Sequence, residues 1–195
     1  MDTATRARCN RIAPFLCLII SAAILVSQRP APAAQLMAIY GASAAEERAI
    51  DWSVRRYRTA GLDGMPDLEV FLHRSHDGCS GDGGLYHAGR IDLCTEDLTV
   101  SYQKKIALHE MAHAWIEANV DPEVLDRFMD IRGLATWNDR NFGWRDRGNE
   151  QTAEIITWGL GEGEIAPLLP EAIDAATLAM LYRLLTDREP ITPAA

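Results

Sequence analysis

Residues 102–119 read YQKKIALHEMAHAWIEAN, a stretch with neither glycine nor proline. Because both helix breakers are absent, the stretch predicts one long helix that begins near Thr99. Within it, His109 and His113 are four residues apart and therefore lie on one face of the helix, one turn from each other. Two imidazoles in this arrangement can bind one zinc ion, at about 2.0–2.1 Å each.

The residue after the first histidine, Glu110, completes the pattern His-Glu-x-x-His. A carboxylate in this position can reach a metal-bound water and take its proton, because the metal lowers the pKa of that water toward roughly 7. The pattern has only three fixed positions and also arises by chance, in which case both histidines are ordinary core or surface residues. The surrounding helix, an export signal and a second acidic motif favour the metal site.

The second acidic motif lies in residues 148–158, which read GNEQTAEIITW. Asn149 is predicted to cap a helix that begins at Glu150, and Glu154 follows one turn later on the same face. A catalytic zinc takes three protein ligands and keeps one position open, so Glu150 is the candidate third ligand. Glu154 would then orient a histidine ring through its second nitrogen, although the two glutamates could exchange these roles. In the plainer interpretation, the glutamate pair belongs to a solvent-exposed helix face.

The motifs HEMAH and EQTAE, which begin at His109 and Glu150, are separated by 36 residues. This pairing resembles the gluzincins, zinc metallopeptidases whose third ligand is a glutamate, and is similar to that in the catalytic domain of anthrax lethal factor. The resemblance implies a compact zincin-like α+β domain. It also implies that His109, His113 and Glu150 bind one zinc ion and that Glu110 is the general base.

The resemblance further implies a peptide or protein substrate, held by an edge strand that precedes the active-site helix. The segment Arg90–Leu93 would take this role, because an extended peptide can add to a sheet edge through main-chain hydrogen bonds. Peptide hydrolysis also needs a further donor for the oxyanion. Lethal factor has a tyrosine shortly before its glutamate ligand, whereas this chain has neither tyrosine nor histidine between Ala114 and Asn149. The candidates by residue type are Tyr86, His87, Trp144 and Arg145.

The N-terminal residues 1–33 have the plan of a secretory signal peptide. Arginines up to Arg11 precede an apolar run at Ile12–Val26, and a stretch of proline and alanine follows. The apolar run has about 15 residues, whereas a membrane-spanning helix needs about 20, so cleavage after Ala33 is favoured over a permanent anchor. We therefore expect a secreted or extracytoplasmic protein, with membrane contact only through an uncleaved leader.

Cys79 and Cys94 are the two cysteines outside this leader. In an oxidising compartment such a pair most simply forms a disulfide, and closing a loop of about 15 residues would stabilise the fold by about 3 kcal/mol. Two free thiols are one alternative, and a zinc site that uses both sulfurs is another, although the spacing is far from C-x2-C.

The rest of the chain predicts an α+β fold with a small sheet, the active-site helix and several packing helices. Capping residues and apolar spacing predict further helices at 44–60, 121–133 and 171–186. A strand is predicted at 68–73, and residues 84–94 predict a hairpin that turns near Ala88 and Gly89. Residues 34–195 would form one domain, as their number suggests.

Composition limits what the protein can do. The chain has 195 residues, with 19 Lys and Arg against 28 Asp and Glu, and a formal net charge of -9. This acidity, with arginines scattered along the chain, disfavours binding to nucleic acid. The sequence therefore predicts an exported zinc metallopeptidase. The alternatives are a non-catalytic extracellular binding module stabilised by metal, and a zinc hydrolase that acts on a non-peptide amide.

Overall fold

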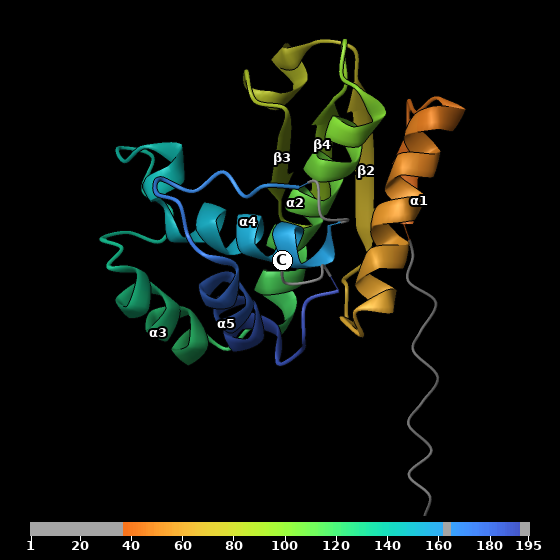
Figure 1. The fold of residues 1–195 in the computed structure, drawn as a ribbon. Coiled ribbons are helices and arrows are strands. Elements are labelled where there is room, and N and C mark those ends of the chain that lie inside the picture. Colours follow the sequence, from red (N-terminus) through yellow and green to blue (C-terminus); the bar gives the residue numbers. More distant parts are fainter. Residues whose placement is uncertain (1–36, 162–164, 192–195) are drawn as a thin grey trace, which may run out of the picture. The chain divides into compact units, whose positions relative to one another are not determined.

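The structure, a computed structural model, describes residues 37–161 and 165–191, so the predicted leader lies outside the described residues. The described chain has an α+β fold with a four-stranded mixed sheet and five α-helices (Figure 1). Its elements, two of them short 3-10 helices (η1 and η2), are β1 (Met37–Tyr40), α1 (Ala44–Thr59), β2 (Leu68–His73), η1 (His76–Cys79), β3 (Gly84–His87), β4 (Arg90–Cys94), α2 (Val100–Asn119), α3 (Pro122–Arg132), η2 (Trp144–Asp146), α4 (Gly148–Leu160) and α5 (Ala175–Thr186).

The strands of the sheet lie in the order β1-β2-β4-β3. β1 pairs with β2 and β2 with β4 in parallel, whereas β3 and β4 form the predicted antiparallel hairpin. The hairpin turns at Ala88 and Gly89, whose φ angles are both positive (48° and 83°), as the twist of a two-residue hairpin turn requires. Strand β1 has no counterpart among the predicted strands, because four residues are too short an alternation to be recognised.

The predicted edge strand is the wrong one. The segment Arg90–Leu93 lies in β4, which is paired on both sides, with β2 and with β3. The strand at the edge of the sheet on this side is β3, at Gly84–His87. The hairpin explains the difference. After the turn, β4 pairs with β2 inside the sheet, so that β3, which precedes the turn, is left at the edge.

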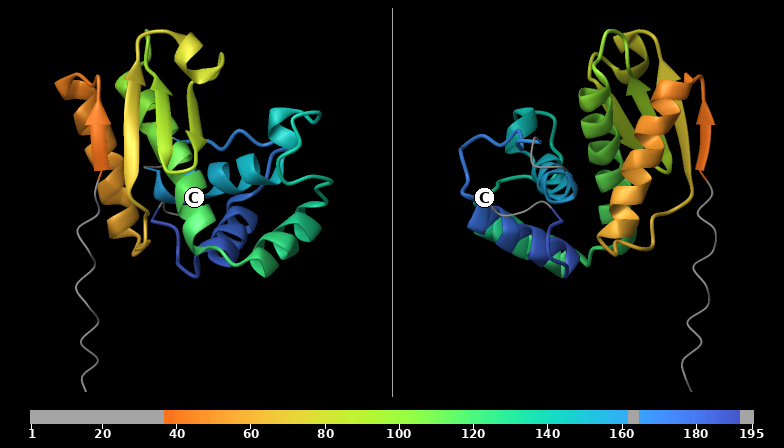
Figure 2. Two further views of the ribbon diagram at one scale, coloured as in Figure 1. Left: turned by 180° about the vertical axis from the view of Figure 1, so that it is seen from behind. Right: turned by 45° about the vertical axis from the view of Figure 1, so that its right-hand side comes forward.

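Helices α1 and α2 cover one face of the sheet (Figure 2). Alternate residues of β2, namely Leu68, Val70 and Leu72, are buried, as expected for a strand with one face on the core. Tyr57 of α1 donates a hydrogen bond from its hydroxyl to the carbonyl oxygen of Leu108 in α2 (3.0 Å). This bond joins the two covering helices within the core.

Helix α2 begins after the cap of Thr99, as predicted, and packs against α4 as well as against the sheet. Every residue of α4 except Asn149 is buried. A helix that is buried nearly all round is a central element of the core. Helix α4 therefore brings the acidic residues of the second motif to α2 inside the protein rather than to a solvent-exposed face.

Two helices begin at residues other than those predicted. Helix α4 begins at Gly148 rather than at Glu150, because the main-chain N–H groups of Gly148 and Asn149 donate to carbonyls of the preceding loop (3.1 and 3.0 Å). The side chain of Asn149 is thereby left to bind Glu150. Helix α5 begins at Ala175 rather than at 171, because Asp174 caps it.

Cys79 and Cys94 form the predicted disulfide, which joins η1 to the end of β4. The buried apolar side chains of the sheet and the helices form one connected core. Among the described helices, none combines the length and the apolarity that a membrane span requires.

Candidate metal centre

Helices α2 and α4 bring three potential metal ligands together. His109 Nε2 lies 3.1 Å from Glu150 Oε2 and 3.2 Å from His113 Nε2, and His113 Nε2 lies 3.3 Å from the same carboxylate oxygen. The exposed fractions of the side chains are 7% for His109, 14% for His113 and 10% for Glu150. Among the described residues, these three form the one close group of histidine, cysteine and acidic side chains that could hold a metal ion.

The geometry and the donor types both fit a metal ion. Two imidazole nitrogens and one carboxylate oxygen are donors that zinc binds at about 2.0–2.2 Å, and donors at such distances on the corners of a tetrahedron lie about 3.4 Å apart. The observed separations of 3.1 to 3.3 Å are close to that value. Three protein donors leave one corner for water or substrate, which is the arrangement of catalytic zinc sites.

Glu154 lies behind His109, one helical turn after Glu150. Its Oε1 lies 3.1 Å from His109 Nδ1. Its Oε2 accepts the main-chain N–H of Leu168 (2.6 Å) and lies 3.4 Å from the Nζ atom of Lys105. Glu154 therefore faces the ring nitrogen of His109 that does not belong to the triad, which is the position of an orienting carboxylate.

The carboxylate of Glu110 lies against the start of the edge strand β3. A Cβ atom on Gly84 would stand 2.5 Å from Oε1 of Glu110 and 2.7 Å from its Cγ, so only glycine leaves room for this side chain. Burial raises the pKa of Glu110, while the nearby His109 and His113 and a main-chain hydrogen bond from Tyr86 act in the opposite direction. A carboxylate with a raised pKa is better matched to proton transfer near neutral pH than an ordinary one.

Two aromatic side chains lie against the histidines. Trp144 of η2 stacks on His109, with ring centroids 5.5 Å apart and an interplanar angle of 28°. Tyr86 of β3 stacks against His113 at a centroid distance of 6.4 Å, and its hydroxyl donates to Glu117 (2.6 Å). Burial and the bond to Glu117 raise the pKa of Tyr86 to about 12. Tyr86 therefore keeps its hydroxyl proton at physiological pH and can act as a donor.

The outer oxygen of Glu150 is bonded by Asn149 and faces Arg147. Asn149 Nδ2 donates to Glu150 Oε1 (2.9 Å), and the Nη1 atom of Arg147 lies 3.8 Å from the same oxygen. Oε2 of Glu150 is the oxygen that contacts His109 and His113. The two carboxylate oxygens thus face different groups, and only one of them belongs to the triad.

The triad is strongly coupled in its electrostatics. Burial lowers the pKa of His109, but its contacts with Glu150 and Glu154 outweigh burial and raise the pKa to about 10. Burial raises the pKa of Glu150, but its contacts with His109 and His113 hold that pKa well below the usual range. Without a metal ion, a proton on His109 therefore lies between the two glutamates. A metal ion would compete with that proton, since metal ligands must be deprotonated.

The structure brings two of the four predicted oxyanion donors to the triad. Tyr86 and Trp144 contact the histidines as described above. His87, the next residue of β3, faces the opposite side of the sheet, and its Nε2 lies 3.2 Å from Asp92. Arg145 is exposed to solvent.

Sequence reasoning missed two residues of the site, Arg147 and Gly84. Arg145 and Arg147 both precede α4 in an irregular segment, and their spacing does not indicate which of them turns toward the helix. Gly84 offered a weak signal, because a glycine in a strand often marks the close approach of another group.

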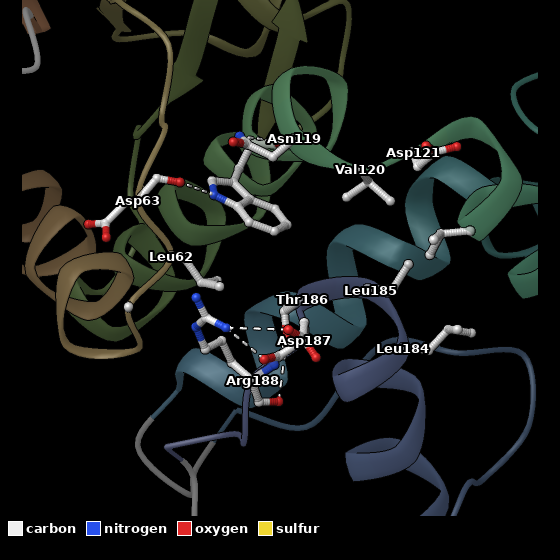
Figure 3. A pocket seen from close by; sticks show the side chains of 13 residues that line it. Leu62, Asp63, Asn119, Val120, Asp121, Leu184, Leu185, Thr186, Asp187 and Arg188 are labelled. Atoms are coloured by element: carbon white, nitrogen blue, oxygen red, sulfur yellow. Dashed lines mark hydrogen bonds and ion pairs between the residues drawn. The ribbon is translucent and has the colours of Figure 1, made fainter. Parts of the chain in front are cut away.

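A pocket of about 380 Å³ lies apart from the triad, where the C-terminal ends of α2 and α5 meet the segment after α1 (Figure 3). Leu62, Val120 and Leu185 contribute apolar surface to it, and Asp63 and Arg188 contribute polar groups. The pocket shares no residue with the triad. Because a candidate active site needs reactive groups within reach of one another, the triad rather than this pocket is the candidate site.

Comparison of the chain with known protein families, with curated proteins and with solved structures finds no match. The resemblance to gluzincins therefore rests on the two motifs and on the geometry of the triad.

Proposed function

We propose that the protein is an exported, zinc-dependent peptidase. The observation that carries the proposal is the convergence of His109, His113 and Glu150, whose donor atoms lie 3.1 to 3.3 Å apart in a nearly buried site. Buried polar and charged groups at such distances need a shared proton or cation between them. Zinc suits this set of two nitrogens and one oxygen.

The side chains around the triad have the chemistry that peptide hydrolysis needs. A zinc ion bound here would polarise a carbonyl group and lower the pKa of a water molecule to about 7. Glu110 would accept a proton from the attacking water and later deliver one to the leaving nitrogen, and its raised pKa suits both transfers. Glu154 would keep His109 in its orientation through the contact with Nδ1.

Tyr86 is the better placed of the predicted oxyanion donors. Its ring lies against His113, and its hydroxyl stays protonated. The hydroxyl would have to leave Glu117 in order to donate to a substrate oxygen. Trp144, by contrast, uses its ring face to cover His109.

The edge strand β3 is the proposed binding surface for an extended peptide, which would add to the sheet through main-chain hydrogen bonds. Gly84 lies beside Glu110, and Tyr86 lies beside His113. A peptide along this edge would therefore pass next to the triad. The proposed substrate is a peptide or protein segment in extended conformation.

An extracytoplasmic location is part of the proposal. The disulfide between Cys79 and Cys94 supports it, because disulfides persist in oxidising compartments and are rare in the cytosol. N-terminal sequencing of the exported protein would test the proposed cleavage after Ala33.

Two measurements test the proposed function. Metal analysis of the purified protein should find one zinc ion per chain. Glu110→Gln should keep the zinc and the thermal stability but lower peptide hydrolysis by roughly 10²-fold or more, which is the usual contribution of a general base. Glu123→Gln, on the exposed side of α3, is the matched control and should keep wild-type activity.

The outcomes separate the competing hypotheses. Zinc-loaded wild-type protein that cleaves nothing in a broad peptide library would contradict the peptidase and favour a metal-stabilised binding module. Cleavage of non-peptide amides alone would favour a different hydrolase. Failure to bind zinc with the triad intact would contradict the metal centre itself.

A further inference from the structure

The guanidinium of Arg147 lies beside the triad without a hydrogen-bond partner among the described residues. Only 13% of the side chain is exposed, and its Nε atom is buried with no acceptor. Its ion-pair contact, from Nη1 to Oε1 of Glu150, is 3.8 Å long and therefore too long for a hydrogen bond.

Two other arginines near α4 show the contrast. Arg132 is 10% exposed, but its Nε donates to the Oε1 atom of Gln151 (3.0 Å), and its Nη1 lies 3.3 Å from Oε1 of Glu171. Arg56 donates to two main-chain carbonyl oxygens at the end of α4 (2.5 and 2.8 Å). A largely buried guanidinium without such acceptors destabilises the fold, because its charge has lost its hydration and has no hydrogen bonds that replace it. Because Nε of Arg147 is buried, the terminal nitrogens of its guanidinium are the donors that a ligand could use.

A metal ion in the triad would leave Arg147 with still less compensation, because Glu150 would then share its negative charge with the metal. A negatively charged group on the substrate would compensate the positive charge of Arg147. The chain as a whole has a formal net charge of -9 and repels acidic substrates, so an acidic substrate would need a local positive group at the site.

We propose that Arg147 binds a carboxylate of the substrate next to the scissile bond, so that the enzyme prefers peptides with an acidic group at that position. This inference rests on the proposed peptidase function. A guanidinium matches a carboxylate through two parallel N–H donors, which gives such pairs both strength and directional specificity.

Arg147 approaches Glu150 from the side away from the two histidines. It would therefore bind a substrate carboxylate that neighbours the scissile bond, and not the carbonyl group that reacts. Arg147 meets Glu150 at Oε1, whereas His109 and His113 both contact Oε2. The guanidinium of Arg147 and the two imidazoles therefore face different oxygens of the Glu150 carboxylate. Arg147 is accordingly a specificity-determining residue and not the oxyanion donor.

The test uses pairs of peptides that differ only by glutamate or glutamine, placed in turn at each position on both sides of the cleaved bond, and a further pair with a free or amidated C-terminus. For wild-type enzyme, one acidic peptide should have a kcat/KM at least roughly tenfold above that of its neutral partner, mainly through KM, since hydrogen bonds to charged groups are the stronger ones.

Arg147→Gln should abolish this preference, and Arg147→Lys should keep part of it, because lysine retains the charge but not the planar fork. Arg140→Gln is the matched control, since it removes an exposed arginine from the same irregular segment, and it should leave the preference unchanged. Zinc content is measured for every variant. If Arg147→Gln lowers zinc affinity but keeps the preference, Arg147 only orients Glu150 and the inference is wrong.

A second readout separates this inference from the proposed function. Zinc-loaded Glu110→Gln protein, which would bind without cleaving, is titrated calorimetrically with the same peptides, alone and combined with Arg147→Gln. Tighter binding of the acidic peptide that is lost in the double variant supports the inference even if wild-type protein cleaves nothing. Equal binding of the acidic and neutral peptides, or a difference that survives loss of Arg147, overturns it.

Discussion

The close contact between Gly84 and Glu110 allows the geometry of the proposed general base to be tested by adding a single methyl group. In Gly84→Ala the new Cβ would stand 2.5 Å from Oε1 of Glu110, 2.7 Å from its Cγ and 2.7 Å from Cγ2 of Ile106. Carbon atoms in good contact lie about 3.5–4.0 Å apart, so the carboxylate must withdraw by roughly 1 Å. The edge strand cannot absorb all of this movement, because β3 is paired with β4 along its length.

Two magnitudes follow from this displacement. Overpacking of a buried site typically costs about 1–3 kcal/mol of stability. A displacement of roughly 1 Å in a catalytic group typically lowers the rate by about 10²-fold. We therefore expect Gly84→Ala to bind zinc, to unfold at lower denaturant concentration, and to lose most of the proposed peptidase activity.

The stability effect can be assigned by a double-mutant cycle that needs no substrate. Glu110→Ala removes both Oε1 and Cγ, so the added methyl group should cost at least about 1 kcal/mol less in this background. Gly83→Ala is the matched control, because its Cβ would be close only to the terminal Cδ1 of Ile106, at 2.9 Å, a flexible methyl that can turn away, while Cγ1 of the same residue lies at an ordinary contact distance of 3.7 Å. Its cost should be small and similar in both backgrounds. Equal costs of Gly84→Ala with and without the Glu110 side chain, measured by urea unfolding, would refute the proposed packing of Glu110 against β3.

Three further predictions concern the metal, the pH dependence and the disulfide. Glu150→Gln should weaken zinc binding at least roughly tenfold in a competition with a chelating dye, since even supporting residues of metal sites contribute this much; unchanged affinity would remove Glu150 from the ligand set. His109 has a pKa of about 10 in the folded chain, above its ordinary value, so its stabilising effect on the metal-free protein is complete below about pH 6.5 and is lost as the pH rises toward 10. The melting temperature of metal-free protein should accordingly fall over this range more than that of zinc-loaded protein, and parallel curves would contradict the coupling. Replacing both Cys79 and Cys94 by serine should lower the free energy of unfolding by about 3 kcal/mol, the loop-closure value for this spacing, and a loss near zero would show that the disulfide contributes little.

Local signals explain most of what was predictable from the sequence. The capping box at Ser43 and the cap at Thr99 mark the starts of α1 and α2, and both involve residues within one turn of each other. The shared face of His109 and His113 follows from helical geometry in the same way. Properties that depend only on a few consecutive residues can be read without knowing the fold.

Contacts between distant elements account for what could not be predicted. The choice between β3 and β4 as the edge strand depends on the pairing of β4 with β2, which brings together residues such as Val70 and Ile91 from separate parts of the chain. Likewise, the start of α4 depends on hydrogen bonds from Gly148 to the preceding loop, and these overrule the capping preference of Asn149. The inward turn of Arg147 is a property of that same loop, so no spacing rule distinguishes it from Arg145.

The buried acids bear on the choice between the proposed metal centre and a structural ion pair. Glu110, Glu150 and Glu154 are all buried at one place in the core. Lys105 lies beside Glu154, and His109 and Arg147 lie beside Glu150, so Glu110 is the one of the three acids without such a partner among the described residues. Glu150 adds to the upward shift of the Glu110 pKa. A protein that needed only a buried histidine–glutamate pair would gain stability by replacing the remaining acids with apolar residues. The proposed metal centre would give each acid a separate role: Glu150 would bind the cation, Glu154 would orient His109, and Glu110 would transfer a proton.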